Sequence, residues 1–373
     1  MILTYDNIVN APASDVAGWN AFFTLQSGTA NGSLIKSVNV LGNVVTLHGA
    51  KGITLKTSIF ANNTHLISFV DDESQVVQLN GTAFSGCTIL TTLDLNAVTN
   101  IGGSAIINCT ALTTLNLARC VFVGGNSVQG CTSLTSVNLS KAVMFIASAF
   151  LGCTSLTTLN LPMCKAISAS TFSGCTALTT VNAPLLTTIM NNAFQNCTSL
   201  TSINFPQCVT ISSAAFSGCT SLATINLPYC RTLLDTVFDL CAAITSVSLP
   251  FCRYIGASAF TTVPLLTSIS LPECHYLGAS NFSNALLLTS ASFPKCRTII
   301  GPLVSGATNL TSLNISECRN LGISAANNSV FNLSGNTLTI TLHKSLMTNN
   351  VGGPDGDVQY LIDNNTETII QVG

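Results

Sequence analysis

Apolar residues return at five fixed positions, +3, +6, +8, +14 and +19, in a 22-residue unit counted from a cysteine. In the unit that begins at Cys153, these positions hold Leu156, Leu159, Leu161, Ile167 and Phe172. Between +5 and +8 polar and apolar residues alternate, which is typical of a short strand with one buried face. The pattern therefore predicts one short strand in every unit.

Two ranks of cysteine mark the repeat. The first cysteine rank has a spacing of 22 and comprises Cys87, Cys109, Cys131, Cys153, Cys175, Cys197, Cys219 and Cys241. The second cysteine rank is offset by half a repeat and comprises Cys120, Cys164, Cys208, Cys230, Cys252, Cys274, Cys296 and Cys318. Where a rank lacks a cysteine, its place is taken by Val98, Ala142, Leu186, Val263, Ala285 or Ala307. Residues 84–325 therefore read as eleven 22-residue repeats without an insertion.

The turns of the repeat have their own residues. Gly or Asn precedes the first cysteine of most units, and both tolerate a left-handed backbone conformation. Leu240 and Thr262 stand at this position in two units in place of Gly or Asn, so the turn is expected to differ there. One unit buries too few side chains to offset the entropy of ordering it, so the units must stack and shield one another.

The unit Leu156-x-x-Leu159-x-Leu161-x-x-Cys164 matches the leucine-rich repeat motif. The Ile-x-x-x-x-Phe half and the Gly-Cys-Thr turn resemble the BspA-like (Treponema pallidum-type) subclass, over about two thirds of the chain. The resemblance implies a repeat solenoid: a right-handed leucine-rich-repeat coil, mostly β with turns and 3-10 segments, whose short parallel strands line one face. It implies surface binding or adhesion and no single activity.

The segments outside the array are predicted to be caps. Residues 1–83 form an N-terminal cap with degenerate repeats at 33–40 and 58–70, where Asn63 stands in a cysteine position, and a short amphipathic helix at 14–26. Residues 326–373 form a C-terminal β cap with a strand within 336–343 and a hairpin at 358–372. These ends either shield the core or dock to a partner.

The low charge and the interrupted apolar runs of the chain argue against some classes of partner, namely nucleic acid and the membrane interior. Only 7% of residues are charged and the formal net charge is −2, which gives no basic field for nucleic acid. Polar residues interrupt the apolar runs before any reaches the length of a membrane span, so no membrane insertion is expected. The first ten residues show no secretory signal pattern.

The cysteines are predicted to be buried thiols that pack the core. Neighbours in one rank lie close enough for disulfides, but Cys120 and Cys164 have no cysteine on either side in their rank, and the substitutes are apolar. His48, His65, His275 and His343 are scattered, and no paired spacing typical of zinc ligands occurs. Asp355 and Asp357 are read as a turn rather than a calcium site. No catalytic motif is found, so neither enzymatic activity nor a cofactor is expected.

Two surfaces are candidates for binding. One is a carpet of Thr, Ser and Asn on the strand face, which either binds glycan or ice or simply satisfies its own hydrogen bonds. The other flanks the second cysteine rank in the later repeats, where Glu273, Lys295 and Glu317 also lie. Its candidate partner-binding stripe comprises Tyr229, Arg231, Phe251, Arg253, His275, Arg297 and Arg319. The alternative for this stripe is a solvated rim that keeps the protein soluble.

The sequence favours a non-enzymatic scaffold that displays a rigid surface. The first hypothesis is a bacteriophage virion component, a tail or fibre receptor-binding protein or a capsid decoration, made in host cytoplasm and in contact with other virion proteins. The alternative is a bacterial cell-surface adhesin of the BspA-like type, and a distant third is an ice- or glycan-binding Thr/Asn face. The expected partner is a protein or a surface glycan.

Overall fold

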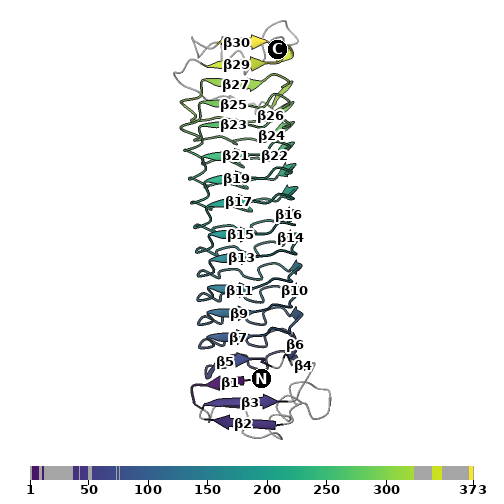
Figure 1. Ribbon diagram of the computed structural model, residues 1–373. Helices are drawn as coiled ribbons and strands as arrows, with labels where there is room; N and C mark the ends of the chain where they lie inside the picture. The colour runs from purple at the N-terminus through teal and green to yellow at the C-terminus, as the bar shows by residue number, and fades with distance from the viewer. Residues whose placement is uncertain are drawn as a thin grey trace. The chain divides into compact units, whose positions relative to one another are not determined.

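The computed structural model describes residues 2–7, 11, 37–41, 43–48, 53–72, 74, 76–322, 338–346 and 369–372. The chain divides into two compact units, Met1–Pro184 and Leu185–Gly373. Each unit is a parallel β-solenoid, in which every turn (a coil, one repeat of the sequence) carries short strands that pair with those of the next coil (Figure 1). The predicted fold class is confirmed. The proposed division at residues 83/84 and 325/326 stays a prediction.

In unit 1 the coils carry two sets of strands. The first set comprises β5 (Leu66–Val70), β7 (Thr92–Asp94), β9 (Thr114–Asn116), β11 (Ser136–Asn138), β13 (Thr158–Asn160) and β15 (Thr180–Asn182). The second set comprises β4 (Ile53–Leu55), β6 (Val76–Leu79), β8 (Asn100–Ile101), β10 (Phe122–Val123), β12 (Met144–Phe145) and β14 (Ala166–Ile167). Pairs such as Thr114↔Ser136 and Thr158↔Thr180 keep the 22-residue register.

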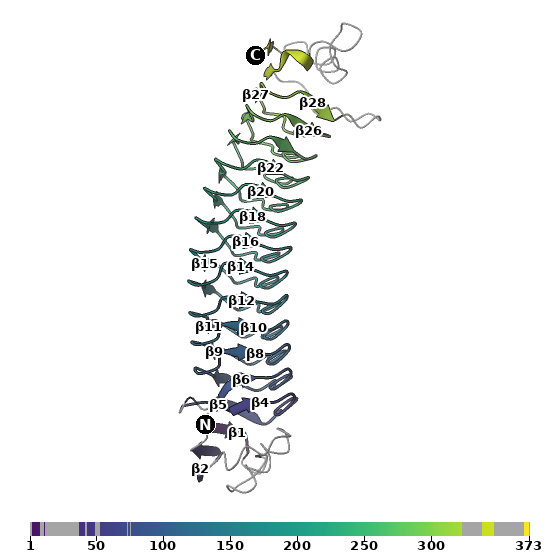
Figure 2. The same ribbon diagram turned by 90° about the vertical axis from the view of Figure 1, so that its right-hand side faces the viewer.

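Unit 2 repeats the arrangement. Its first set comprises β17 (Ser202–Asn204), β19 (Thr224–Asn226), β21 (Ser246–Ser248), β23 (Ser268–Ser270), β25 (Ser290–Ser292) and β27 (Ser312–Ile315). Its second set, drawn in Figure 2, comprises β16 (Thr188–Ile189), β18 (Thr210–Ile211), β20 (Thr232–Leu233), β22 (Tyr254–Ile255), β24 (Tyr276–Leu277), β26 (Thr298–Ile300) and β28 (Asn320–Gly322). Within this second set, from β16 to β28, each strand pairs in parallel with the next strand of the same set, so that β16 pairs with β18 and β18 with β20.

The second set of strands was not predicted. The sequence pattern indicated one strand per repeat, at +5 to +8, and the structure confirms strands from +5 to +7 in the regular coils. A two-residue strand ending at +14 has only one inward residue, such as Ile211 or Ile255, so it shows no alternation along the chain. This second set of strands borders the candidate stripe.

Phenylalanine rings stack through the core of unit 2. Phe194, Phe216, Phe238, Phe260 and Phe282 are fully buried at the +19 position. Successive ring centroids lie 5.2, 5.6, 5.3 and 5.7 Å apart, with planes within 26° of parallel. Each coil therefore packs its core directly against that of its neighbour, as expected of a repeat protein.

The turn before the first cysteine is left-handed in most coils. Gly218 has φ +76°, and an added Cβ would collide with the side-chain oxygen of Asn196 in the previous coil. Leu240 adopts the same conformation with φ +60°, so the turn does not change there although the residue does. Thr262 has no positive φ, so the expected difference is confirmed at that coil.

Antiparallel strands begin unit 1. β1 (Ile2–Tyr5) pairs with β5 and with β3 (Val44–His48), and β3 pairs with β2 (Ser37–Leu41). The prediction of a degenerate repeat at 33–40 is therefore wrong for its described part, because β2 belongs to a hairpin. The segment 58–70 does form a coil, since β5 pairs in parallel with β7. The helix predicted at 14–26 lies outside the described residues.

At the other end of the chain, β29 (Thr339–Leu342) pairs in parallel with β27 and with β30 (Ile369–Val372), and η2 (Lys344–Leu346) follows β29. The strand predicted within 336–343 is confirmed. The first half of the predicted hairpin lies outside the described residues, and its second half, β30, extends the parallel sheet. In the described parts of the chain, no helix has the length and apolar character needed to cross a bilayer.

Candidate functional site

The cysteines lie inside the coils. All sixteen are buried thiols and none forms a disulfide, as predicted. Thiols of the first rank donate to backbone carbonyls of the preceding coil, as from Cys109 Sγ to Phe84 O at 3.0 Å. Thiols of the second rank donate two residues ahead, as from Cys164 Sγ to Ala166 O at 3.2 Å. Burial raises the pKa of Cys164 to about 11 and that of Cys120 to about 12, so both stay protonated at neutral pH.

The histidines remain apart from one another. His65 Nδ1 lies 3.1 Å from an Asp6 carboxylate oxygen, and His343 Nδ1 lies 2.8 Å from Ser345 Oγ. Across the described ranges, no three His, Cys, Asp or Glu side chains come together in an arrangement that could hold a metal ion. Asp355 and Asp357 lie outside those ranges.

The polar carpet satisfies many of its own hydrogen bonds. Directly before the strands of this face, the hydroxyls of Thr135, Thr157 and Thr179 each donate to the threonine carbonyl one coil earlier, at 3.1 to 3.3 Å. Asn182 Nδ2 donates to Asn160 Oδ1 at 2.8 Å, and other coils repeat this ladder. The arrangement favours the self-satisfied alternative for this face, which includes a hollow of about 510 Å³ over β7, β9 and β11.

The cationic part of the stripe forms one straight row in unit 2, which we call the arginine file: Arg231, Arg253, His275, Arg297 and Arg319. Each backbone N–H donates to the carbonyl of the file member one coil earlier, at 2.9, 2.9, 3.0 and 3.1 Å from Arg253 to Arg319. The four arginine residues are exposed. Because neighbouring strands lie ~4.8 Å apart, the file presents one basic or imidazole side chain per coil at that spacing.

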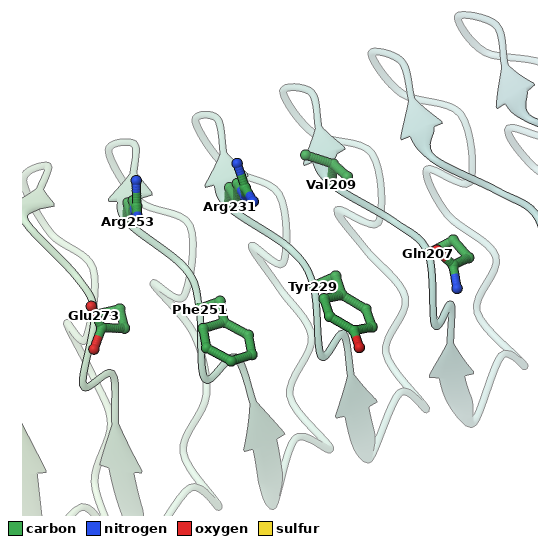
Figure 3. Close-up of a pocket in the computed structure, with 7 residues that line it drawn as sticks. All are labelled: Gln207, Val209, Tyr229, Arg231, Phe251, Arg253 and Glu273. Atoms are coloured by element: carbon green, nitrogen blue, oxygen red, sulfur yellow. The ribbon is translucent and has the colours of Figure 1, made fainter.

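A second row runs beside the arginine file, two residues earlier in each coil. Tyr229 and Phe251 open it and are 55% and 52% exposed. Their ring centroids lie 6.3 Å apart and their planes differ by 11°. Figure 3 shows the two rings side by side on neighbouring coils, with the arginines of the same coils beside them. Together the rings make a flat apolar platform.

A groove of about 710 Å³ lies between these rows. Its lining residues are Gln207, Val209, Tyr229, Arg231, Phe251, Arg253 and Glu273. Figure 3 shows them as two parallel rows from successive coils. The structure thus brings four residues of the candidate partner-binding stripe into one concave surface.

Electrostatics make this surface positive. Lys295 Nζ lies 2.6 Å from Glu273 Oε1, and this hydrogen bond is the largest cause that lowers the pKa of the Glu273 carboxyl. The guanidinium of Arg253 also interacts electrostatically with Glu273 and helps to lower the pKa of that carboxyl. Five of the chain's twelve Lys and Arg residues lie in the strip from 231 to 319. Four acids, Asp235, Asp239, Glu273 and Glu317, lie in the same strip, so its formal charge is +1 in a chain of net charge −2.

Comparison with known proteins gives the family. The family model of the BspA type leucine rich repeat region matches residues 53–179, 144–253 and 231–350. The chain belongs to this family. No curated protein sequence matches it.

Several solved structures are similar to this BspA-type chain. A leucine rich cell surface protein from Faecalibacterium prausnitzii is 23% identical over 81% of this chain and 87% of that one, with a TM-score of 0.42. A leucine-rich repeat protein from Bacteroides ovatus is 20% identical over 80% and 88%, with a TM-score of 0.40. The T. pallidum leucine rich repeat protein is 20% identical over 62% and 88%, with a TM-score of 0.35. At these values the similarities say nothing about function.

The groove lies on repeats that the family model matches, so it is a decoration of the BspA-type coil rather than an added domain. Sequence reasoning missed Gln207 and Val209, which stand one repeat before Tyr229 and Arg231 and were detectable by that register. It also missed Tyr254 and Tyr276, whose rings stack at 4.6 Å directly after two members of the arginine file. His275, Arg297 and Arg319 continue the file outside the groove lining.

Proposed function

We propose that this protein is a non-enzymatic binding protein of a bacterial cell surface, an adhesin that engages its partner through the groove and the arginine file. The observation that carries the proposal is the groove itself, where exposed aromatic and arginine side chains gather on an otherwise charge-poor solenoid. Aromatic and arginine residues are the usual anchors of binding surfaces. Membership of the BspA-type family supports the same proposal, because surface binding and adhesion are what this family implies.

The chemistry of the groove supports binding rather than catalysis. Its single carboxylate, Glu273, is held by Lys295, and no second acid lines the groove. The nearest thiol in sequence to Arg231, Cys230, is buried and points its Sγ to a backbone carbonyl. A nucleophile paired with a base is therefore lacking among the lining residues.

The family match favours the cell-surface alternative over the virion hypothesis. The virion hypothesis rests on composition and on the first residues of the chain, and the match to the BspA type gives it no support. We therefore propose the cell surface as the location and a surface glycan or protein as the partner. An antibody against the protein is expected to label intact source cells. If it labelled purified phage particles and did not label the cells, the virion hypothesis would be favoured instead.

Replacing the four arginines Arg231, Arg253, Arg297 and Arg319 together with serine is expected to weaken partner binding by at least about tenfold. Because these side chains are exposed, the free energy of unfolding should change little, by about 0.5 kcal/mol or less per site. Binding of labelled protein to intact epithelial and bacterial cells, measured by flow cytometry, gives the affinity, and thermal unfolding gives the stability.

The matched control removes cations from the corresponding edge of unit 1. Arg119→Ser, Lys141→Ser and Lys165→Ser flank the second cysteine rank there and should leave cell binding unchanged. If the four-arginine variant bound cells as well as the parent protein, the stripe would be a solvated rim and the proposed function would lose its site.

A further inference from the structure

The two rows that border the groove define the chemistry of the ligand. We propose that the groove binds a linear acidic polysaccharide, a polyuronate chain, laid along the rows so that successive sugars lie over successive coils. This inference rests on the proposed function and names the ligand class of the same surface.

The aromatic platform suits a sugar ring. Tyr229 and Phe251 expose about half of their surface, and their planes differ by only 11°. The face of an aromatic ring carries partial negative charge, and it attracts the weakly positive C–H groups on the flat side of a pyranose. Two adjacent rings thus offer a seat for two adjacent sugars.

The arginine file suits carboxylates. Arg231 and Arg253 stand beside the platform, and neither guanidinium has an ion-pair partner among the described side chains. A guanidinium binds a carboxylate through two parallel hydrogen bonds, which makes arginine the preferred partner of that group. The one carboxylate of the groove, Glu273, is neutralised by Lys295 at 2.6 Å. A sugar acid on the platform therefore meets Arg231 and Arg253, of which Arg253 also interacts electrostatically with Glu273.

The spacing of the rows favours a sugar polymer over a peptide. Rows repeat at the strand spacing of ~4.8 Å, which is close to the length of one sugar ring in an extended chain. An extended peptide advances ~3.3 Å per residue, and a stacked nucleic-acid strand advances ~3.4 Å per nucleotide. Neither repeat matches one charge per coil.

The backbone groups of the arginine file are already hydrogen-bonded, so a peptide cannot dock there by adding a strand. A peptide that adds as a strand needs an edge with unpaired N–H and C=O groups. Here the carbonyl of Arg231 already accepts from the N–H groups of Arg253 and Tyr254, at 2.9 and 3.2 Å. Recognition at these rows therefore falls to side chains, as for a glycan.

The test uses the full chain and a galacturonate hexamer, with its neutral methyl ester as the matched ligand, in isothermal titration calorimetry. We expect the hexamer to bind, the methyl ester to lose at least about tenfold in affinity, and added salt to weaken binding. The variant Arg231→Ser/Arg253→Ser should lose about tenfold or more, and so should Tyr229→Ser/Phe251→Ser. The control Arg119→Ser/Lys141→Ser, which removes the same charge in unit 1, should bind as the parent does.

Four results would overturn the proposal. Equal binding of the acid and its methyl ester would show that the carboxylate is not recognised. Tighter binding of a polyglutamate peptide or of oligo(dT), lost in the same variants, would make the ligand an acidic peptide or a nucleic acid. Absence of hexamer binding, together with loss of cell binding in the four-arginine variant, would reject the polyuronate and leave the adhesin function standing. Absence of hexamer binding, with cell binding unchanged in the four-arginine variant, would reject both proposals.

Discussion

Raising the pH from 8 to 10 is expected to lower the free energy of unfolding strongly, because the core thiols can ionise only when the chain opens. In the unfolded chain a thiol loses its proton near its ordinary pKa of about 8.5 to 9. In the folded protein burial holds the pKa of Cys164 at about 11 and those of Cys120, Cys175, Cys208 and Cys219 at about 12. The folded state therefore binds more protons than the unfolded state above pH 9.

The sign follows from this proton count. A group whose pKa is higher in the folded protein than in the unfolded chain stabilises the fold fully below its pKa in the unfolded chain. That stabilisation is lost as the pH rises through its pKa in the folded protein. Each of these five thiols thus removes about 1 kcal/mol for every unit of pH above 9, until about pH 11 to 12. At pH 10 the five together remove on the order of 5 kcal/mol, comparable to the whole stability of many domains.

Denaturant midpoints measured by circular dichroism at pH 7, 8, 9 and 10 give this dependence. The chain supplies its own control substitution, since Ala142 occupies the second cysteine rank. In the variant Cys164→Ala, the free energy of unfolding should fall less between pH 9 and 10 than in the parent protein, by about the contribution of one thiol. A midpoint that stays constant from pH 8 to 10 would mean that the thiols do not lie in an apolar core.

The substitution Phe238→Ala is expected to lower the free energy of unfolding by about 3 to 5 kcal/mol. The ring is fully buried and packs between Phe216 and Phe260, at centroid distances of 5.6 and 5.3 Å. Truncation removes contacts on both sides, and the neighbouring rings cannot close the gap because each is held in its own coil. Chemical denaturation measures the change.

Phe251→Ala is the matched control on the surface. Phe251 is 52% exposed, so its truncation should change the free energy of unfolding by no more than about 0.5 kcal/mol. It should instead weaken ligand binding, because it removes half of the aromatic platform. Equal destabilisation by the two variants would contradict the division between packing and binding residues.

Much of the fold could be predicted because the 22-residue period fixes register as well as strand position. Once Thr158 and Thr180 are known to be equivalent, their pairing in neighbouring coils follows, and the structure has it. Asn63 could be placed in the same way. Its side-chain oxygen accepts the N–H groups of His65 and Leu66 at 2.9 Å each, so it orders the turn before β5.

The parts that escaped prediction lack that period. β1 joins the sheet antiparallel at its start, and the pattern Ile2–Tyr5 has no counterpart in the repeat. The hairpin strand β2 alternates polar and apolar residues as a coil strand does, so its pattern alone could not separate the two pairings. Leu240 shows the converse, because the fold imposes φ +60° on a residue that disfavours it.

The candidate site was only partly foreseeable. Their positions beside the second cysteine rank singled out Tyr229, Phe251 and the arginines, but the groove depends on side-chain placement that the register does not give. The contact between Lys295 and Glu273 is of a different kind, since residues one repeat apart at equivalent positions must lie on neighbouring coils. Charge pairs between coils can therefore be predicted in such chains, whereas hollows between rows cannot.

The most direct measurement of the central claim, that the inner residues including the cysteines serve packing and leave binding to the outer rows, is site-resolved thiol alkylation. Native protein at pH 7, treated with iodoacetamide and analysed by mass spectrometry, should show all sixteen cysteines unmodified. The same protein unfolded in guanidinium without reductant should show all sixteen modified. Cysteines that react in the native state, or that stay blocked as disulfides after unfolding, would contradict the account.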